Sequence, residues 1–450
     1  MNGLRGTLLF ATLMLTAAVM LLTAVPATAQ IPLPDFTEYA IPETLNPATS
    51  PDWYEYVDLG ALVVGLSLAT YLALVSRSRR GLFLLAVASV AWLGFWREGC
   101  VCPIGAIQNV ALAACDPTYV VPWVVIALFA LPLIFALFFG RTFCAAVCPL
   151  GAVQELVAIR PIRVPTWLDQ ALGLLAYVYL GAGVLFAATG TAFVICRYDP
   201  FVAFFRLGGS RNMLLLGAGF LAIGFFIGRP YCRYLCPYGA VLGLLSKVSA
   251  WHVKIPPTDC IQCKLCEDAC PYGAIREPTV TQSADTRKSG RRRLGLLLLL
   301  MPVLLGVGAW LGFQLKEPMA RLHPTVALAE RIRWEDTQRA RLASTDATDV
   351  VVETTDASEA FRDSGRDVED LYLAAMRQTG RLGYAGALFG AWVGLVLGVK
   401  LIHLSVRRRR VDYEPDRAGC VSCGRCFWYC PSEQSRLGLI QNLTTSEDKP

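Results

Sequence analysis

Two cysteine quartets have a spacing that is typical of iron–sulfur ligands. Both follow the pattern C-x2-C-x2-C-x3-C-P, and their members are Cys260, Cys263, Cys266, Cys270, Cys420, Cys423, Cys426 and Cys430. Three thiolates spaced in this way wrap one face of a [4Fe–4S] cluster, and the fourth reaches a neighbouring cluster. Zinc sites usually group their cysteines as two pairs, so the spacing favours two [4Fe–4S] clusters over zinc.

The fourth cysteine of each quartet is expected to exchange, as it does in two-cluster ferredoxins. One cluster would be held by Cys260, Cys263, Cys266 and Cys430, and the other by Cys420, Cys423, Cys426 and Cys270. The two halves lie far apart in the sequence. A ferredoxin fold can therefore close only if both halves lie in the same compartment.

A second motif, Arg-x-x-Cys-x3-Cys-Pro-x-Gly-Ala, begins at Arg141 and again at Arg229. Proline suits the first position of a helix, so the preceding cysteine should cap that helix and have a lowered pKa. We expect these cysteines to gather on the inner face as a redox relay or a metal site, with simple packing as the alternative. This inner cysteine group consists of Cys144, Cys148, Cys232 and Cys236.

Four further cysteines are expected on the outer face, and this outer cysteine group consists of Cys100, Cys102, Cys115 and Cys196. Two interpretations of these cysteines remain open, namely a redox or metal site and a pair of disulfides. Only one residue separates Cys100 from Cys102, which disfavours a mutual disulfide and favours partners such as Cys115 or Cys196. The sequence has no Cys-x-x-Cys-His, no glycine-rich phosphate loop and no nucleophile–base motif, so an electron-transfer component is favoured over a stand-alone enzyme.

Apolar runs predict the elements that position these cysteines. Of the 450 residues, 55% are hydrophobic and 17% are charged, whereas soluble domains have about 25% charged residues. A bilayer is crossed by about 20 apolar residues. The predicted spans are residues 59–76, 81–96, 121–140, 171–195, 212–228, 294–313 and 383–404. The short run 81–96 lies between arginines that can reach the membrane surface.

The distribution of arginine and lysine predicts the orientation of these spans. If the chain starts outside at Gln30, the basic runs at 77–80, 287–293 and 407–410 fall on the cytoplasmic side, as do Arg141 and Arg229. Both ferredoxin halves then share the cytoplasm of a bacterial inner-membrane protein. Three arginines oppose this bias in a loop placed outside, namely Arg197, Arg206 and Arg211.

The predicted fold is an α-helical polytopic membrane protein of about seven spans after a signal sequence, with a split two-cluster ferredoxin-like α+β module on the cytoplasmic side. Residues 1–29 read as a signal peptide, or as a retained first helix. The further divisions are a short periplasmic segment 30–58, a five-span core 59–254, ferredoxin half 255–290, span 294–313, periplasmic helical insert 314–382, span 383–404, and a second ferredoxin half with the tail 411–450. The insert is either a solvated unit without chemistry or a docking surface.

The motifs resemble those of the membrane polyferredoxins of the NosR and NapH type. The matching stretches are Arg141-Thr-Phe-Cys144-Ala-Ala-Val-Cys148-Pro, Arg229-Pro-Tyr-Cys232-Arg-Tyr-Leu-Cys236-Pro, Gly99-Cys100-Val-Cys102-Pro and the two ferredoxin quartets. The resemblance implies electron transfer between the quinone pool, or a cytoplasmic donor, and a periplasmic redox system. Residues 30–58 are too short for the periplasmic flavin-binding domain of NosR-like proteins, and NapH-like proteins lack an insert like 314–382.

Two functions of different class follow from these motifs. The first is an electron-transfer component in the lipid bilayer, with a quinone or cytoplasmic donor and a periplasmic redox protein or metalloenzyme as partners. The second is a maturation or regulatory protein for a periplasmic copper enzyme, in which the outer cysteine group handles metal and the clusters sense redox state. The net charge of +6 is too diffuse to indicate nucleic-acid binding.

Overall fold

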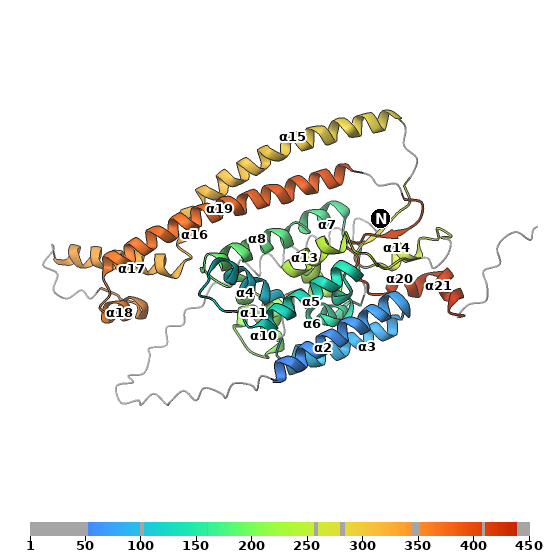
Figure 1. Ribbon diagram of the computed structural model, residues 1–450, viewed down its shortest axis with the longest axis horizontal. Helices are drawn as coiled ribbons and strands as arrows, with labels where there is room; N and C mark the ends of the chain where they lie inside the picture. The colour runs from blue at the N-terminus through green and yellow to red at the C-terminus, as the bar shows by residue number, and fades with distance from the viewer. Residues whose placement is uncertain are drawn as a thin grey trace, which may run out of the picture.

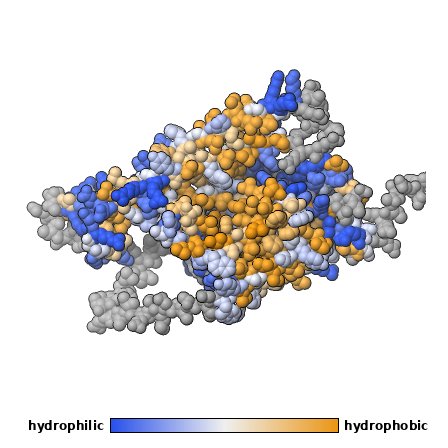
Figure 2. Space-filling view, viewed as in Figure 1, coloured by the Kyte–Doolittle hydropathy of each residue, from blue (hydrophilic) through white to orange (hydrophobic). Residues whose placement is uncertain are grey.

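Long helices run between two polar ends of the molecule (Figure 1). The computed structural model describes residues 53–99, 103–159, 161–255, 260–279, 284–343, 352–406 and 410–438. The predicted signal peptide, residues 30–52 of the predicted periplasmic segment, Cys100 and Cys102 lie outside the described residues. Apolar side chains cover the middle of the molecule and polar side chains gather at both ends (Figure 2), as expected for a chain that crosses a membrane.

Five stretches of the described chain are long and apolar enough to span a bilayer. They are formed by α2 (Trp53–Thr70) with the π-helical turn η1 (Tyr71–Val75), α3 (Arg79–Ser89) with η2 (Val90–Trp96), α7 (Thr166–Leu172) with α8 (Leu175–Ala188), α15 (Ala284–Gln314), and α19 (Val368–Ser405). The short predicted span 81–96 is among them. Predicted spans 121–140 and 212–228 correspond to the shorter helices α5 (Trp123–Phe139) and α11 (Arg211–Gly224).

Several short helices fill the space between the spans. They are α4 (Pro103–Cys115), η3 (Phe143–Val147), α6 (Pro149–Val157), α9 (Val194–Arg197), α10 (Pro200–Phe205), α12 (Pro230–Tyr234) and α13 (Pro237–Ser246). Helices α4, α6 and α13 each begin at the proline of a Cys-Pro pair. They are packed into the main core, where Ile104, Leu150 and Tyr238 are buried. Helix α13 packs against α5 and α8, which fixes the second Cys-Pro repeat to the long helices.

The ferredoxin module consists of two separate pieces of chain that meet at one end of the long helices (Figure 1). The first piece holds α14 (Leu265–Ala269) and β1 (Ile275–Arg276), and the second holds β2 (Glu414–Pro415), α20 (Arg425–Tyr429) and α21 (Pro431–Arg436). Strands β1 and β2 pair antiparallel, with Ile275 opposite Pro415. The two halves therefore lie at the same end of the molecule.

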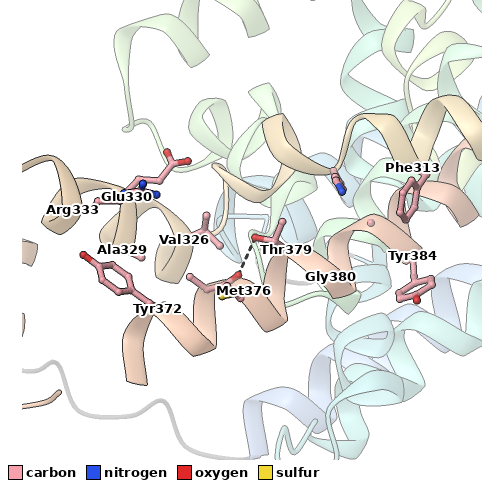
Figure 3. A pocket seen from close by; sticks show the side chains of 13 residues that line it. Phe313, Val326, Ala329, Glu330, Arg333, Tyr372, Met376, Thr379, Gly380 and Tyr384 are labelled. Atoms are coloured by element: carbon pink, nitrogen blue, oxygen red, sulfur yellow. Dashed lines mark hydrogen bonds between the residues drawn. The ribbon is translucent and has the colours of Figure 1, made fainter. Parts of the chain in front are cut away.

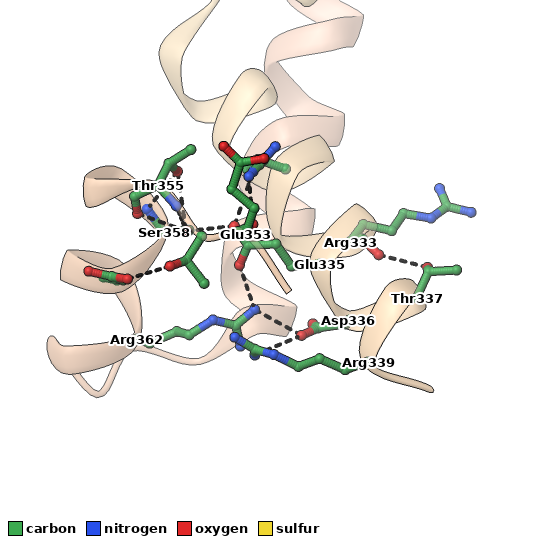
Figure 4. A network of polar contacts seen from close by, with 12 residues as sticks. Arg333, Glu335, Asp336, Thr337, Arg339, Glu353, Thr355, Ser358 and Arg362 are labelled. Atoms are coloured by element: carbon green, nitrogen blue, oxygen red, sulfur yellow. Dashed lines mark hydrogen bonds and ion pairs between the residues drawn. The ribbon is translucent and has the colours of Figure 1, made fainter. Parts of the chain in front are cut away.

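The insert forms a folded helical unit at the opposite end (Figure 1). Helices α16 (Lys316–Ala320), α17 (Pro324–Ala343) and α18 (Asp356–Asp363) pack with the first part of α19 around Ile332, Phe361 and Leu371. Buried Glu335 ties α17 to α18, because it accepts hydrogen bonds from Ser358 (2.7 Å) and Arg362 (3.2 Å) (Figure 4). A cavity of about 640 Å³ lies between α17 and α19, with Phe313 and Tyr384 at one end and Tyr372 at the other (Figure 3).

Helices α15 and α19 connect the two ends of the molecule and pack backbone to backbone. A Cβ atom at Gly308 or Gly312 of α15 would overlap the carbonyl group of Gly390 or Gly386 of α19. Small residues allow this approach, which is a common basis of helix pairing in membranes. The pair is held to the rest of the core through Trp392, whose indole N–H donates to the carbonyl oxygen of Tyr177 at 2.9 Å.

Candidate metal centres

The structure gathers the eight ferredoxin cysteines into two sets of four. In the first, Cys266 lies beside Cys260, Cys263 and Cys430. In the second, Cys426 lies beside Cys420, Cys423 and Cys270. We call these the far set and the core-side set, according to their distance from the membrane core. The last cysteine of each quartet thus lies with the first three cysteines of the other quartet.

The backbone around the two sets repeats the same unusual conformation. Gln262 and Lys264, on either side of Cys263, have φ values of 52° and 64°. Ser422 and Gly424, on either side of Cys423, have φ values of 55° and 74°. Alternation of this kind turns successive N–H groups toward one centre, where they can meet an anion or the sulfurs of a cluster. In the core-side set, backbone N–H groups of Ser422 and Arg425 donate to the thiols of Cys420 and Cys423.

The chemistry of the two sets fits iron–sulfur clusters. Burial raises the pKa of Cys266 to about 11 and that of Cys420 to about 12, so these thiols keep their protons unless a metal displaces them. Among the described residues, no three His, Cys, Asp or Glu side chains close tightly around a space the size of a single ion. A [4Fe–4S] cluster is larger than one ion and therefore holds its four thiolates further apart. The two sets are the residues that would hold such clusters.

The inner cysteine group also comes together. Cys236 lies beside Cys232, Cys148 and Cys144, and none of the four is in a disulfide. The thiol of Cys236 accepts a hydrogen bond from the backbone N–H of Gly239 (3.2 Å), that of Cys232 from the side chain of Gln154 (3.3 Å), and that of Cys144 from Arg141 (3.8 Å). N–H donors of this kind stabilise thiolates and tune bound metal centres.

One expectation about the inner cysteine group is wrong. Cys148 and Cys236 do precede helices α6 and α13, with proline at the first helical position. The pKa of Cys236 nevertheless lies well above its ordinary value, because burial outweighs the N–H group of Gly239, and burial raises the pKa of Cys232 to about 12. A position at a helix N-terminus does not make a thiol acidic once water is removed from it.

The arginine that opens each repeat packs against the other repeat. Arg141 of the first repeat lies over Gly239 of the second, and Arg229 of the second lies over Gly151 of the first. Arg229 is 1% exposed, has a φ of 50°, and donates to the carbonyl oxygens of Cys144 and Ala145. These crossed arginines explain why glycine recurs in the Cys-Pro-x-Gly phrase, since a Cβ atom there would lie 3.1–3.2 Å from a guanidinium nitrogen. The sequence displays the phrase but not its long-range partner.

Glu155 of α6 joins the membrane core to the ferredoxin module. Its carboxylate accepts from Arg79 of α3 (2.7 Å), Arg229 (3.2 Å) and Arg425 of α20 (2.9 Å), and also from the hydroxyl of Tyr272. Burial opposes ionisation, but the three arginines and the hydroxyl outweigh it and lower the pKa of Glu155 to about 2. The side chain is 5% exposed, so this is a buried charge that is compensated on several sides.

Two arginines interact with both the inner cysteine group and the core-side set. Arg229 interacts electrostatically with Cys232 and with Cys423. Arg141 interacts with Cys144 and Cys420, and it donates to the carbonyl oxygen of Ala418 at 2.9 Å. The core-side set therefore lies directly against the inner cysteine group, across a single layer of guanidinium groups.

The structure does not gather the described members of the outer cysteine group. The Cys196 sulfur lies beside Gly105, in the first turn of α4. Cys115 is the last residue of α4, and the ten positions from Gly105 to Cys115 rise about 15 Å along a helix. Cys115 is exposed and lies far from Cys196, whereas Cys100 and Cys102 lie outside the described residues.

Comparisons with known proteins match the same cysteine-containing segments. Residues 121–168 and 212–256 match a family model described as a 4Fe-4S binding domain, and residues 253–276 match a second model with the same description. The first match includes both inner repeats. No solved structure matches the chain.

Several curated proteins are similar to parts of the chain. NirI of Paracoccus denitrificans is 30% identical over 282 residues, which are 56% of this chain and 40% of that protein. The putative electron transport protein YccM of Escherichia coli is 29% identical over 156 residues, 31% of this chain and 43% of that protein. The regulatory protein NosR of Pseudomonas aeruginosa is 30% identical over 152 residues, 31% of this chain and 21% of that protein. The chain thus spans less than half the length of these three relatives.

The segments matched by the family models contain the inner cysteine group and the first ferredoxin quartet. The family models describe 4Fe-4S binding domains, and the helices include stretches able to cross a membrane. The chain therefore contains 4Fe-4S binding segments in a helical protein with stretches able to cross a membrane, and over part of its length it is similar to NirI, YccM and NosR.

Proposed function

We propose that this protein transfers electrons between a cytoplasmic ferredoxin module and the membrane, and so links the quinone pool or a cytoplasmic donor to a periplasmic redox system. One observation carries the proposal: the core-side set lies against the inner cysteine group, with Arg229 interacting with Cys423 on one side and Cys232 on the other. A redox centre that only sensed its surroundings would not need to be placed against a second group of buried thiols.

The far set and the core-side set are the residues that would hold two [4Fe–4S] clusters. When bound, such clusters supply reversible one-electron chemistry. The chain's own contribution is to direct backbone N–H groups at the sulfurs of the core-side set and to place arginines beside it. The far set includes exposed Cys263, which gives a soluble donor or acceptor access to the module.

The orientation in the membrane is part of the proposal. The ferredoxin halves and the helical insert lie at opposite ends of α15 and α19 (Figure 1). The basic run 287–293 lies at the ferredoxin end of α15, which favours a cytoplasmic location for that end. The insert then faces the periplasm, where a redox protein or metalloenzyme can reach it.

The inner cysteine group is proposed as a further thiolate-bound metal centre or redox relay. Four thiols from two repeats lie together, and those of Cys144, Cys232 and Cys236 accept N–H hydrogen bonds. The Nε atom of Arg141, a residue that is 9% exposed, has no hydrogen-bond partner. A buried orphan donor beside four thiols is the environment that a sulfur-containing centre satisfies.

Iron and acid-labile sulfide analysis of anaerobically purified protein, followed by EPR after reduction with dithionite or quinol, tests the electron-transfer function. We expect [4Fe–4S] signals, about eight irons if only the ferredoxin sets are loaded, and more if the inner cysteine group holds an iron cluster. Cys423→Ser should remove one signal, whereas Cys115→Ser at the exposed end of α4 should leave both. Absence of any [4Fe–4S] signal would refute the proposal.

A maturation or regulatory function is the second candidate. It is favoured by similarity to NosR, a relative named as a regulatory protein. The Cys196 sulfur also lies beside Gly105 in the first turn of α4, and Cys100-Val-Cys102 directly precedes that helix in the sequence. Replacement of all four outer cysteines by serine separates the two functions. A loss of metal from the periplasmic partner enzyme, with cluster reduction intact, would favour maturation, and unchanged metal content would remove its basis.

A further inference from the structure

The two ferredoxin sets lie in very different electrostatic surroundings. Four arginines interact with the core-side set, namely Arg79, Arg141, Arg229 and Arg425. Glu155 pairs with three of them, Arg79, Arg229 and Arg425, and remains ionised because of these three. Among the described groups that act on these cysteines, arginines therefore outnumber carboxylates.

The far set has no such excess of positive charge. Glu267 and Asp268 follow Cys266 directly in α14, and both pair with the exposed side chain of Arg163, Glu267 at 3.6 Å. Around Tyr413, which lies beside Cys266, Lys264 is opposed by Glu267 and Glu277, so positive charge is not in excess. Arg77 interacts with both Cys426 and Cys430, and it therefore does not distinguish the two sets.

We propose that the crossed arginines Arg141 and Arg229 raise the reduction potential at the core-side set above that at the far set, so that an added electron is held beside the membrane core. This inference rests on the proposed electron-transfer function. The transfer is one electron from the far site, which is oxidised, to the core-side site, which is reduced, and neither a proton nor a leaving group is involved. Nearby positive charge stabilises the more negative, reduced state, and the effect is strongest where water is excluded.

Partial burial alone acts in the opposite direction, since an extra negative charge is costly where contact with water is reduced. The arginines decide the sign because their charges are fixed in place before the electron arrives. Arg229 is held by Glu155 and by two carbonyl oxygens, and Arg141 by the carbonyl oxygen of Ala418. No reorganisation of these side chains is needed when the site is reduced.

Redox titration of the anaerobically purified full chain, followed by EPR, tests the inference. Cys423→Ser identifies which signal belongs to the core-side set. Arg229→Gln and Arg141→Gln should each lower the midpoint potential of that signal by at least about 59 mV. For one electron, this shift changes the equilibrium distribution of the electron between the two sites tenfold. Glu155→Gln removes a negative charge and should shift the same signal upward. Iron content should remain at the wild-type level in all three.

Arg163→Gln is the matched control, because it removes an arginine beside the far set and should leave the core-side signal unchanged. General loosening of the fold cannot shift the midpoint potential in opposite directions in Glu155→Gln and Arg141→Gln. These two variants therefore test the inference even if Arg229→Gln fails to fold. The inference is overturned if these variants shift neither signal, shift both alike, or if the core-side signal has the lower potential in the wild-type protein. An absence of cluster signals in the wild-type protein would instead refute the electron-transfer function.

Discussion

At the scale of single residues, Gly151 and Gly239 determine whether the two inner repeats can exchange their arginines. Each glycine lies beneath the guanidinium group of the other repeat. The exchange places Arg141 beside Cys144 and brings Arg229 to Glu155. The position equivalent to Glu155 in the second repeat is Gly243, which leaves Arg141 without a carboxylate partner and free to reach the ferredoxin loop at Ala418.

Gly239→Ala should disturb this arrangement. The new Cβ atom would lie 3.2 Å from Nη2 of Arg141 and 3.3 Å from the carbonyl oxygen of Cys232, which is backbone and cannot move away cheaply. We expect a loss of about 1–3 kcal/mol in the free energy of unfolding, as is usual for overpacking. Thermal unfolding in detergent measures it.

Gly219→Ala on α11 is the matched control, because a Cβ atom there meets no atom within 4 Å. Alanine is the better helix former, so the Tm of this variant should stay the same or rise. Equal losses in both variants would contradict the role assigned to Gly239.

The sequence predicts the eight ferredoxin cysteines because their ligand spacing is local, with two or three residues between neighbours. It does not predict the crossed arginines, since Arg141 and Gly239 are joined only by the tertiary fold. The expected lowering of the Cys236 pKa is wrong, because a helix N-terminus is visible in the sequence and the burial of a side chain is not.

At the scale of elements, the apolar runs predict the long helices better than the short ones. Helix α19 begins at Val368, well before the predicted span 383–404, because a helix continues past the apolar window into polar solvent. Helices α4, α6 and α13 are too short to fill a 20-residue window, so no apolar run predicts them. The Cys-Pro pairs instead predict the starts of α6 and α13, and both helices do begin at the proline.

The helical insert formed by α16, α17 and α18 should lose stability in acid. Burial opposes ionisation of Glu335, but its contacts with Ser358, Arg362 and Arg331 outweigh burial and lower its pKa (Figure 4). A carboxylate whose pKa is lower in the folded state contributes stability above its unfolded pKa of about 4.3. That contribution is lost as the pH falls through the folded value.

Fluorescence of Trp334, which neighbours Glu335 on α17, would report this transition. The wild-type unit should unfold progressively below about pH 4, whereas Glu335→Gln should be less stable at neutral pH and vary less with acid. Identical pH profiles for the two proteins would show that Glu335 is not held as an ionised group.

At the scale of the whole molecule, α15 and α19 hold the two polar ends at a fixed separation. Gly308→Leu should push α19 away, because a side chain there meets the backbone of Gly390. We expect a loss of at least about 1–3 kcal/mol in the free energy of unfolding, measured by denaturation in detergent. Gly306→Leu, on the same helix with open space around it, should unfold like the wild type, and a matching loss there would contradict close packing of the pair.

The sequence predicted that two distant ferredoxin halves share one end of the molecule, and the pairing of β1 with β2 places them together. This was possible because two independent arguments lead to the same topology. The basic runs predict that both halves lie on one side of the membrane, and the cluster ligands require the two halves to meet. The way in which the insert folds could not be predicted, since its core depends on contacts between Ile332, Phe361 and Leu371 from three separate helices. Neither could the separation of Cys115 from Cys196, which depends on the placement of α4.

The exchange of the fourth ligand between the two halves is the central claim, and EPR of single cysteine variants tests it most directly. Cys430→Ser should weaken or convert the same cluster signal as Cys266→Ser, and should leave the signal that Cys423→Ser removes. If Cys430→Ser instead altered the signal that Cys423→Ser removes, each half would hold its own cluster, and the exchange of ligands would be contradicted.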